Sequence, residues 1–383
     1  MKYLNLAALC FFCTIVPTNT NAFEMTAGDT TFSVTGRVIT YYINTECDSN
    51  PGVVSGAVLL CSGKGANSVS NGYLPTSIEF GIKTTRGGYD ISAGFDYESG
   101  LDANKAINLG GDTEANRIFL TIGNDEMGTI LAGRFWGLYG LDATLEEMSL
   151  IGVGATASAR SPLNTQLGTA GYGYIFTDRP TQLTYTFPSS DVGSIQIGIY
   201  QPFDQAFGAD SGSEEPGVHG RFRYNFGEGG FISSSFLTQS FNNEAAGISD
   251  TSSIVDVVGK VPMGDLTFVG SYYSSKGVGH TVLFLDSHDG TGKARDSDGY
   301  FTQLTYKSGD TTYGINYGVT NLDATSNDEL TLLKKNEKLT IGFYHDFVPG
   351  VKIMGEYSNF SATSHLGADI ENDVFNVGIG FFF

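Results

Sequence analysis

The chain has 383 residues, and its 41 acidic residues outnumber 21 lysines and arginines, so the net charge at pH 7 is −20. This acidity argues against nucleic acid as a partner, because the phosphate backbone would be repelled. With 40% hydrophobic residues, one Trp, 51 Gly, 27 Phe and 20 Tyr, the chain is too polar for a bundle of membrane helices and rich in aromatic residues that favour strands.

The first 22 residues have the pattern of a secretory signal peptide. Lys2 precedes an apolar run from Leu4 to Val16, and the segment ends in Thr20-Asn21-Ala22. The apolar run is shorter than the roughly 20 residues of a membrane-spanning helix, and no later segment reaches that length without polar residues or glycine. We therefore expect residues 1–22 to be removed and residues 23–383 to fold as a single exported domain.

Two cysteines, Cys47 and Cys61, remain after Cys10 and Cys13 leave with the signal peptide. They lie in a stretch rich in Gly, Ser and Asn, and in an oxidising compartment we expect them to form a loop disulfide. A bridge that closes so short a loop contributes roughly 3 kcal/mol, which is enough to pin one loop but not to hold the fold. Metal binding is the minor alternative, since no His or second Cys pair lies nearby.

From Thr30 to Phe383, apolar residues alternate with small or polar residues over segments of about eight to twelve positions, which is typical of membrane-barrel strands. The alternation is evident at 78–83, 218–224 and 338–343. In the last segment one face carries only large apolar residues: Phe375, Val377, Ile379, Phe381 and Phe383. One face suits lipid and the other an aqueous lumen, although a soluble sandwich could alternate likewise.

Short and long breaks between these segments alternate strictly. Seven short turns fall at 86–88, 124–128, 188–193, 227–230, 262–265, 308–310 and 348–350. Eight long polar stretches fall near 44–73, 100–115, 136–178, 201–216, 242–251, 276–299, 321–336 and 361–371. Bacterial membrane barrels have short periplasmic turns and long extracellular loops. The sequence therefore predicts an all-β, transmembrane antiparallel β-barrel of 16 strands, an even number that leaves no open edge and a size that leaves an aqueous channel.

Residues 128–140, GTILAGRFWGLYG, form a predicted strand that ends in Gly-Arg and leads through aromatics into a long loop. This segment resembles the fifth strand and third loop of the general Gram-negative outer-membrane porins. Arg179-Pro180 followed by LTYTFPS at 183–189 is similar to the family's next strand, although the Pro-Glu-Phe tract of enterobacterial third loops has no close match here. The terminal Phe383 is similar to the signal read by the barrel-assembly machinery.

The resemblance implies a sixteen-stranded homotrimer in the outer membrane of a Gram-negative bacterium, in contact with lipid and lipopolysaccharide. It implies a water-filled channel for passive diffusion of small hydrophilic solutes and ions, without a cofactor. It also implies that the third loop, near 136–178, folds into the lumen and sets acidic side chains opposite a basic wall.

The strand alternation selects candidate lumen residues. Inward positions on the first five strands carry Arg37, Lys83, Arg117 and Arg134, and Arg221 and Arg223 follow further round the barrel. An arginine facing hydrocarbon near the midplane costs about 2 to 4 kcal/mol, so these registers turn the side chains inward. The third loop supplies Asp142, Glu146 and Glu147.

If these acids face the first four basic residues, the transverse field would orient dipolar solutes and disfavour apolar ones. The alternatives are that the acids are solvated on an external loop and that the basic residues are scattered lumen charges.

Acidic residues of the predicted outer loops favour mild cation selectivity, whereas the basic wall argues the other way. They lie at Asp204, Asp210, Glu214, Glu215, Asp323, Asp328 and Glu329. Their oxygens suit divalent cations that bridge to lipopolysaccharide, but no spacing is diagnostic of a metal site.

An enzyme is not expected, because the five histidines lie in different segments and no nucleophile motif surrounds any Ser. A substrate-specific channel for a sugar or an anion is one alternative function. A structural or adhesive barrel is another.

Overall fold

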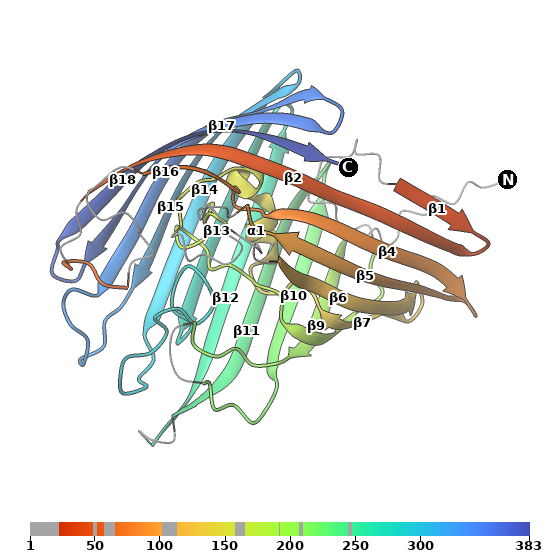
Figure 1. The fold of residues 1–383 in the computed structure, drawn as a ribbon. Helices are drawn as coiled ribbons and strands as arrows, with labels where there is room; N and C mark the ends of the chain where they lie inside the picture. Colours follow the sequence, from red (N-terminus) through yellow and green to blue (C-terminus); the bar gives the residue numbers. More distant parts are fainter. Residues whose placement is uncertain are drawn as a thin grey trace.

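The computed structural model describes residues 23–48, 52–56, 66–101, 113–157, 165–190, 192–206, 210–243 and 247–383, and its strands form one antiparallel sheet (Figure 1). The strands are β1 (Phe23–Ala27), β2 (Thr30–Cys47), β3 (Ala66–Ser70), β4 (Thr76–Arg86), β5 (Tyr89–Ser99), β6 (Thr113–Asn124), β7 (Gly128–Arg134), β8 (Thr181–Thr186), β9 (Gly193–Tyr200), β10 (Gly217–Phe226), β11 (Gly230–Asn243), β12 (Ile248–Met263), β13 (Leu266–Lys276), β14 (Asp296–Ser308), β15 (Thr311–Leu322), β16 (Leu333–Val348), β17 (Val351–Ser364) and β18 (Asp369–Phe382).

The sheet closes on the long strand β2. On one side, β18 pairs with residues 37–47 of β2 and β1 pairs with residues 30–34. On the other side, β3 pairs with residues 41–45 and β4 with residues 30–37. Thus β1 extends the line of β18 and β3 extends the line of β4, so eighteen strand segments fill sixteen positions. The predicted closed, sixteen-stranded antiparallel barrel is confirmed.

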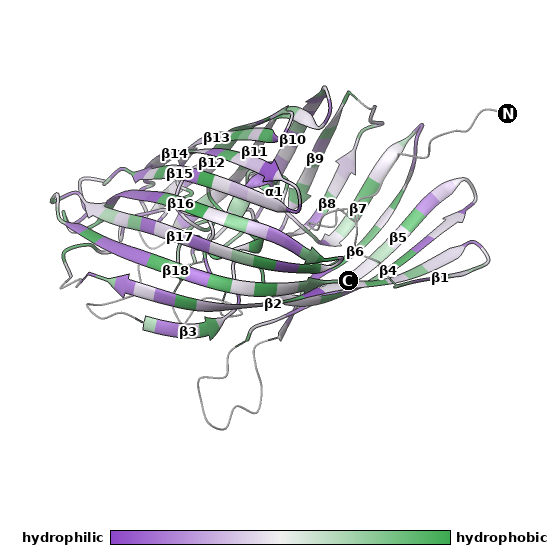
Figure 2. Cartoon of the chain, turned by 90° about the horizontal axis from the view of Figure 1, so that it is seen from above, coloured by the Kyte–Doolittle hydropathy of each residue, from purple (hydrophilic) through white to green (hydrophobic). Residues whose placement is uncertain are grey.

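Alternation along each strand explains why the barrel suits a membrane. On β18, Phe375, Val377, Ile379 and Phe381 are 41–55% exposed, whereas Asn376 between them is fully buried. Figure 2 shows the same banding of hydrophobic and hydrophilic residues along other strands. Apolar side chains left in water would forfeit roughly 25 cal/mol per Å², and acyl chains remove that penalty. A closed barrel also satisfies the backbone hydrogen bonds internally, as a bilayer requires.

All seven predicted short turns join consecutive strands, from β4–β5 to β16–β17, and the eight long loops alternate with them. At the first turn, Gly87 and Gly88 have φ of 59° and 82°, which a two-residue hairpin of type I′ requires at both positions. Among the described residues, no helix is long and apolar enough to cross a bilayer.

Residues 135–180, between β7 and β8, form the third loop, and its described part, 135–157 and 165–180, lies inside the ring of strands (Figure 1). It carries α1 (Leu141–Glu146) and the short 3-10 helix η1 (Met148–Ile151). Its buried residues, such as Leu150, Val153 and Tyr172, share a cluster with inward side chains of β2 and β16 to β18. Much of the lumen beside these strands is therefore occupied by the third loop.

A second loop, residues 277–295 between β13 and β14, reaches the third loop and is called the sixth loop. Phe176 N donates to Thr281 O at 2.8 Å, and Phe284 shares a buried cluster with Tyr139 and Ile175. Thr281, Phe284 and Asp286 have positive φ, a costly conformation for these residue types that the surrounding contacts must hold.

Two sequence predictions lie outside the described residues. Residues 1–22, the predicted signal peptide, are not among them, and neither is Cys61. Cleavage of the signal peptide and the bridge between Cys47 and Cys61 therefore stay predictions.

Candidate functional site: charged clusters in the barrel lumen

A row of charged side chains crosses the lumen face of β2, β4, β5 and β6. Arg37 Nη2 lies 2.8 Å from Glu98 Oε1, and Arg117 lies 2.7 Å from Glu79 and 2.8 Å from Asp96. The register explains the row, because Glu79 lies opposite Asp96 and Asp96 lies opposite Arg117 on successive strands. Arg117 therefore meets a carboxylate on the adjacent strand and Arg37 meets one two strands away, and the pairing offsets the cost of burying both charges.

Arg134 and Arg179 extend this row to the base of the third loop. Arg134 Nε donates to Arg179 O at 3.2 Å, and its Nη2 reaches Asn116 Oδ1 at 3.4 Å. Arg179 lies 3.2 Å from Glu98 and covers the Trp136 ring at 4.0 Å from its centroid. Arg37, Arg117, Arg134 and Arg179 with Glu79, Asp96 and Glu98 are called the strand cluster below.

A second group, the loop cluster, joins α1 to β10–β12. Asp142 is 3% exposed and accepts from Arg221 Nε at 2.7 Å, Arg221 Nη2 at 2.6 Å and Arg223 Nη1 at 2.6 Å. Two-pronged contacts of this kind are among the stronger charge-assisted hydrogen bonds. One turn later, Glu146 pairs with Lys260 at 2.7 Å.

The expected opposition of Asp142, Glu146 and Glu147 to Arg37, Lys83, Arg117 and Arg134 is wrong in its pairing. Asp142 and Glu146 contact basic residues of β10 and β12, across the barrel from the strand cluster. Arg37 already pairs with Glu98, two strands away in the sheet, and Arg117 pairs with Asp96 of the adjacent strand. The physical reason is that α1 runs along the β10–β12 wall, so its carboxylates meet the nearest guanidinium and ammonium groups there.

Glu147 has a different environment from the other two loop acids. It is 3% exposed, and its Oε1 accepts from Tyr174 OH at 2.8 Å and from Thr169 N at 3.1 Å. Lys338 of β16 donates to Gly168 O and Thr169 Oγ1 beside it. Glu147 therefore holds the outgoing and returning arms of the third loop together.

Strand side chains fix the backbone of the third loop to the wall. Glu356 Oε2 accepts from the amides of Val153 and Gly154, each at 2.8 Å. Gln303 Oε1 accepts from Met148 N at 2.6 Å, and Gln182 Nε2 donates to Phe135 O at 2.8 Å. These contacts set the path of the loop, and sequence reasoning did not identify any of them.

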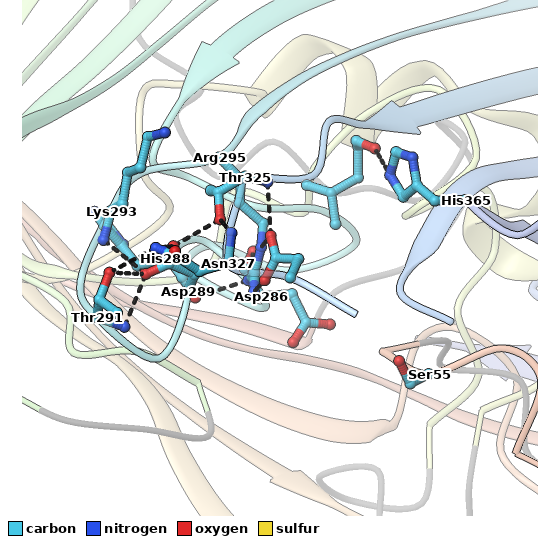
Figure 3. Close-up of polar contacts among 12 residues, drawn as sticks. Ser55, Asp286, His288, Asp289, Thr291, Lys293, Arg295, Thr325, Asn327 and His365 are labelled. Atoms are coloured by element: carbon cyan, nitrogen blue, oxygen red, sulfur yellow. Dashed lines mark hydrogen bonds and ion pairs between the residues drawn. The ribbon is translucent and has the colours of Figure 1, made fainter. Parts of the chain in front are cut away.

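The outer end of the lumen carries a third polar group, shown in Figure 3. Arg295 of the sixth loop pairs with Asp328 of the next loop at 2.5 Å, and Asp289 accepts from Thr325 Oγ1 and Asn327 Nδ2. The hydrogen bond from Arg295 holds the pKa of Asp328 below its usual range. Asp328, one of the predicted acidic residues of the outer loops, is thus bound within a contact between two loops.

Metal ligands were left open by the sequence. Over the part of the chain that the structure describes, no group of three or more His, Cys, Asp or Glu is placed to hold a metal ion. Binding of divalent cations by the outer acidic loops stays a prediction.

A closed barrel with an apolar outer surface and a lumen narrowed by a charged inner loop defines a membrane channel of the porin class. The sequence profile described as Gram-negative porin matches residues 7–365. The chain therefore belongs to the Gram-negative porin family and is an outer-membrane protein. The family and the fold are those of non-enzymatic channels.

Solved structures with the same fold cover nearly the whole chain. The outer membrane channel DcaP of Acinetobacter baumannii has a TM-score of 0.72 at 15% identity, covering 95% of this chain and 100% of that one. The anion-selective porin from Comamonas acidovorans has a TM-score of 0.67 at 13% identity, covering 92% and 100%. The trimer form of OmpT from Vibrio cholerae has a TM-score of 0.58 at 14% identity, covering 92% and 99%. No curated protein sequence matches the chain significantly.

Proposed function

We propose that the protein is a passive diffusion channel for small hydrophilic solutes and ions, and not an enzyme, and that it works without a cofactor. The observation that carries this proposal is the placement of two ionic clusters on facing walls of the lumen, with Arg37 and Glu98 on one side and Asp142 and Arg221 on the other. Ordered charges of this kind favour polar solutes and disfavour apolar ones at the narrowest level. In this proposal Arg37, Lys83, Arg117, Arg134, Asp142, Glu146, Arg221 and Arg223 are the constriction residues.

We also propose weak cation selectivity. The lumen charges are largely paired, as in Arg117 with Asp96 and Lys260 with Glu146. The chain has a net charge of −20, and in this proposal the excess negative charge lies mainly on the loops around the mouth, where it attracts cations. A porin of the same fold is described as anion-selective, so the sign of the selectivity depends on side chains and not on the barrel.

Planar-bilayer recording of the refolded protein tests both parts. We expect large ohmic currents that do not saturate with solute concentration. In a potassium chloride gradient, we expect the sign of the reversal potential to show that potassium passes more readily than chloride. Clear anion preference would end the selectivity proposal. Currents that saturate with salt concentration, or that an unsubstituted sugar or an anion blocks saturably, would favour a substrate-specific channel, and a barrel without conductance would favour a structural or adhesive role.

The proposed assembly is a homotrimer in contact with lipid and lipopolysaccharide, built by the barrel-assembly machinery through the strand that ends in Phe383. The Phe383 amide donates to Gly36 O, and its ring lies 5.4 Å from that of Phe381, so the last residue belongs to the barrel seam. Gel mobility before and after heating tests the oligomer, because a folded trimer migrates as a larger species than the heated chain.

A further inference from the structure

A cavity of about 380 Å³ lies inside the barrel between the start of the third loop and the lower halves of β2 and β4–β9. Its lining includes Thr85, Thr129 and Thr186, which lie next to the short turns. Short turns face the periplasm in bacterial barrels. The cavity therefore opens on the periplasmic side of the loop cluster.

One part of the cavity lining is apolar. This is unexpected, because strand positions that face a water-filled lumen are usually polar or small. The wall comes from two strands and the start of the third loop: Phe119, Leu131, Phe135, Trp136, Leu138 and Leu141. Leu131 points inward while Ile130 beside it is 46% exposed on the lipid face, and Phe119 is flanked likewise by exposed Ile118 and Leu120. These positions thus carry large apolar side chains on the lumen face.

Packing of the loop base accounts for part of this wall. The rings of Phe119 and Phe135 meet edge to face at 4.6 Å, and Trp136 and Leu141 share their cluster. If the residues served only as an anchor, they would close against one another. They leave instead a space in the size range of small-molecule sites, with an apolar wall and a few polar groups.

The same lining offers neutral hydrogen-bonding groups. They come from inward positions of β2, β5, β6, β8 and β9, and two of them flank Leu131 on the adjacent strands: Thr31, Ser92, Thr121, Thr184 and Gln196. Ser92 Oγ and Thr121 Oγ1 lie 2.6 Å apart, and Gln196 Oε1 accepts from Arg221 at 3.0 Å. The lining carries one basic residue, Lys83, and two acids, Asp29 and Asp90, and its other side chains are neutral. The charges therefore do not favour an anionic occupant.

We propose that this cavity is a binding subsite for a neutral amphiphilic solute with an aromatic ring at one end and hydroxyl groups at the other. The ring would pack on Leu131, Phe119 and Trp136, and the hydroxyls would exchange hydrogen bonds with the threonine and serine side chains. The proposal rests on the proposed channel function, because the lumen is the route by which the solute arrives. Gln196 joins the cavity to Arg221 of the loop cluster, so an occupant lies directly in the ion path.

The chain's single tryptophan, Trp136, lines the cavity and reports its occupancy without a label. The experiment titrates phenyl β-D-glucoside into the refolded protein in detergent and follows tryptophan emission. Methyl β-D-glucoside, which has the same sugar but lacks the phenyl ring, is the matched control solute. We expect a saturable change with the phenyl compound and none with the methyl compound.

Two variants and one control test where the ring binds. Leu131→Ser should weaken the binding about tenfold or more, because it removes most of an apolar contact. Ser92→Phe fills the cavity from β5 and should abolish binding even if Leu131→Ser fails to fold. Leu339→Ser, the same change on the lipid face of β16, should bind as the wild type does.

Bilayer current separates this proposal from the channel function itself. We expect phenyl β-D-glucoside to reduce the ion current saturably, in step with the fluorescence change, and the methyl compound to leave it unchanged. Absence of any conductance overturns the proposed channel function, and fluorescence then still decides whether the subsite binds. The subsite proposal is overturned if the two glucosides affect the ion current equally. It is also overturned if the Ser92→Phe variant binds phenyl β-D-glucoside as tightly as the wild type does.

Discussion

The charged side chains of the lumen find their partners differently on the two sides of the barrel. On the side of β4 to β9, strands are 6–12 residues long, the charges pair between neighbouring strands and a cavity remains beside them. On the side of β10 to β18, strands reach 16 residues and their inward side chains bind the third loop. The wall of longer strands, β10 to β18, which we call the taller wall, therefore holds the third loop. The wall of shorter strands, β4 to β9, faces the space that remains for solutes.

The largest effect is expected at the contact of α1 with the taller wall. Asp142→Ala leaves Arg221 and Arg223 without their carboxylate, and breaking such a buried pair costs about 3–5 kcal/mol. We expect a lower unfolding temperature in detergent and a reversal potential shifted toward anions, both measurable on one preparation. Asp125→Ala, at an exposed position in the short turn between β6 and β7, is the matched control. Equal behaviour of the two variants would contradict this account of the taller wall.

Release of the third loop from the taller wall is the next effect. Glu356→Gln removes the charge that two loop amides bind at 2.8 Å, at a cost of about 1.5–3 kcal/mol per bond. Single-channel records should show more frequent current fluctuations, since the loop is less firmly held. Glu371→Gln, an exposed change on β18, should leave the records quiet. A quiet record for Glu356→Gln would mean that apolar packing alone fixes the loop.

Only strong acid should release the contact between the two outer loops. Because Arg295 lowers the pKa of Asp328 in the folded protein, the contact is present at neutral pH and is lost only as pH falls through that lowered pKa. We expect protease resistance of the sixth loop to persist at pH 5 and to fall in stronger acid. Asp328→Asn should lose the resistance already at pH 7, whereas Glu214→Gln should not. Retained resistance in Asp328→Asn would show that the pair does not hold the loops.

The smallest effect is expected at Glu146 and Lys260, whose side chains are 19% and 29% exposed. A partly solvated pair of this kind contributes about 0–1 kcal/mol and is screened by salt. Glu146→Gln should shift the reversal potential slightly at low salt and not at high salt, with Glu126→Gln in the short turn between β6 and β7 as the control. A shift that does not depend on salt would mean that the Glu146–Lys260 pair is less accessible to solvent than its exposed fractions indicate.

Local patterns predicted the fold because membrane strands alternate at a fixed period. The inward positions of Arg37, Arg117 and Arg221 follow from that period, and so does that of Glu79, which alternates with Ile78 and Phe80. Attention to the acids at inward positions would have found the strand cluster from the sequence. The basic residues were instead assigned to the loop acids by resemblance.

The partners of the third loop could not be predicted in the same way. How far α1 reaches across the lumen depends on the whole path of residues 135–180, and no period links it to β10. Glu356 and Gln303 bind loop amides, which leave no trace in side-chain patterns. Arg179 follows a long segment without strand alternation, so its contact with Glu98 had no sequence signal.

The shared edge of β2 has a topological consequence for engineering. Phe23 pairs with Val34, and Phe383 bonds to Gly36, so the two ends of the described chain lie about two residues apart along one strand, or about 7 Å at the usual rise. A linker of a few residues can span that gap. The barrel can then be reopened at a short turn such as 309–310, which makes its chain order permutable while every lateral strand pairing is kept.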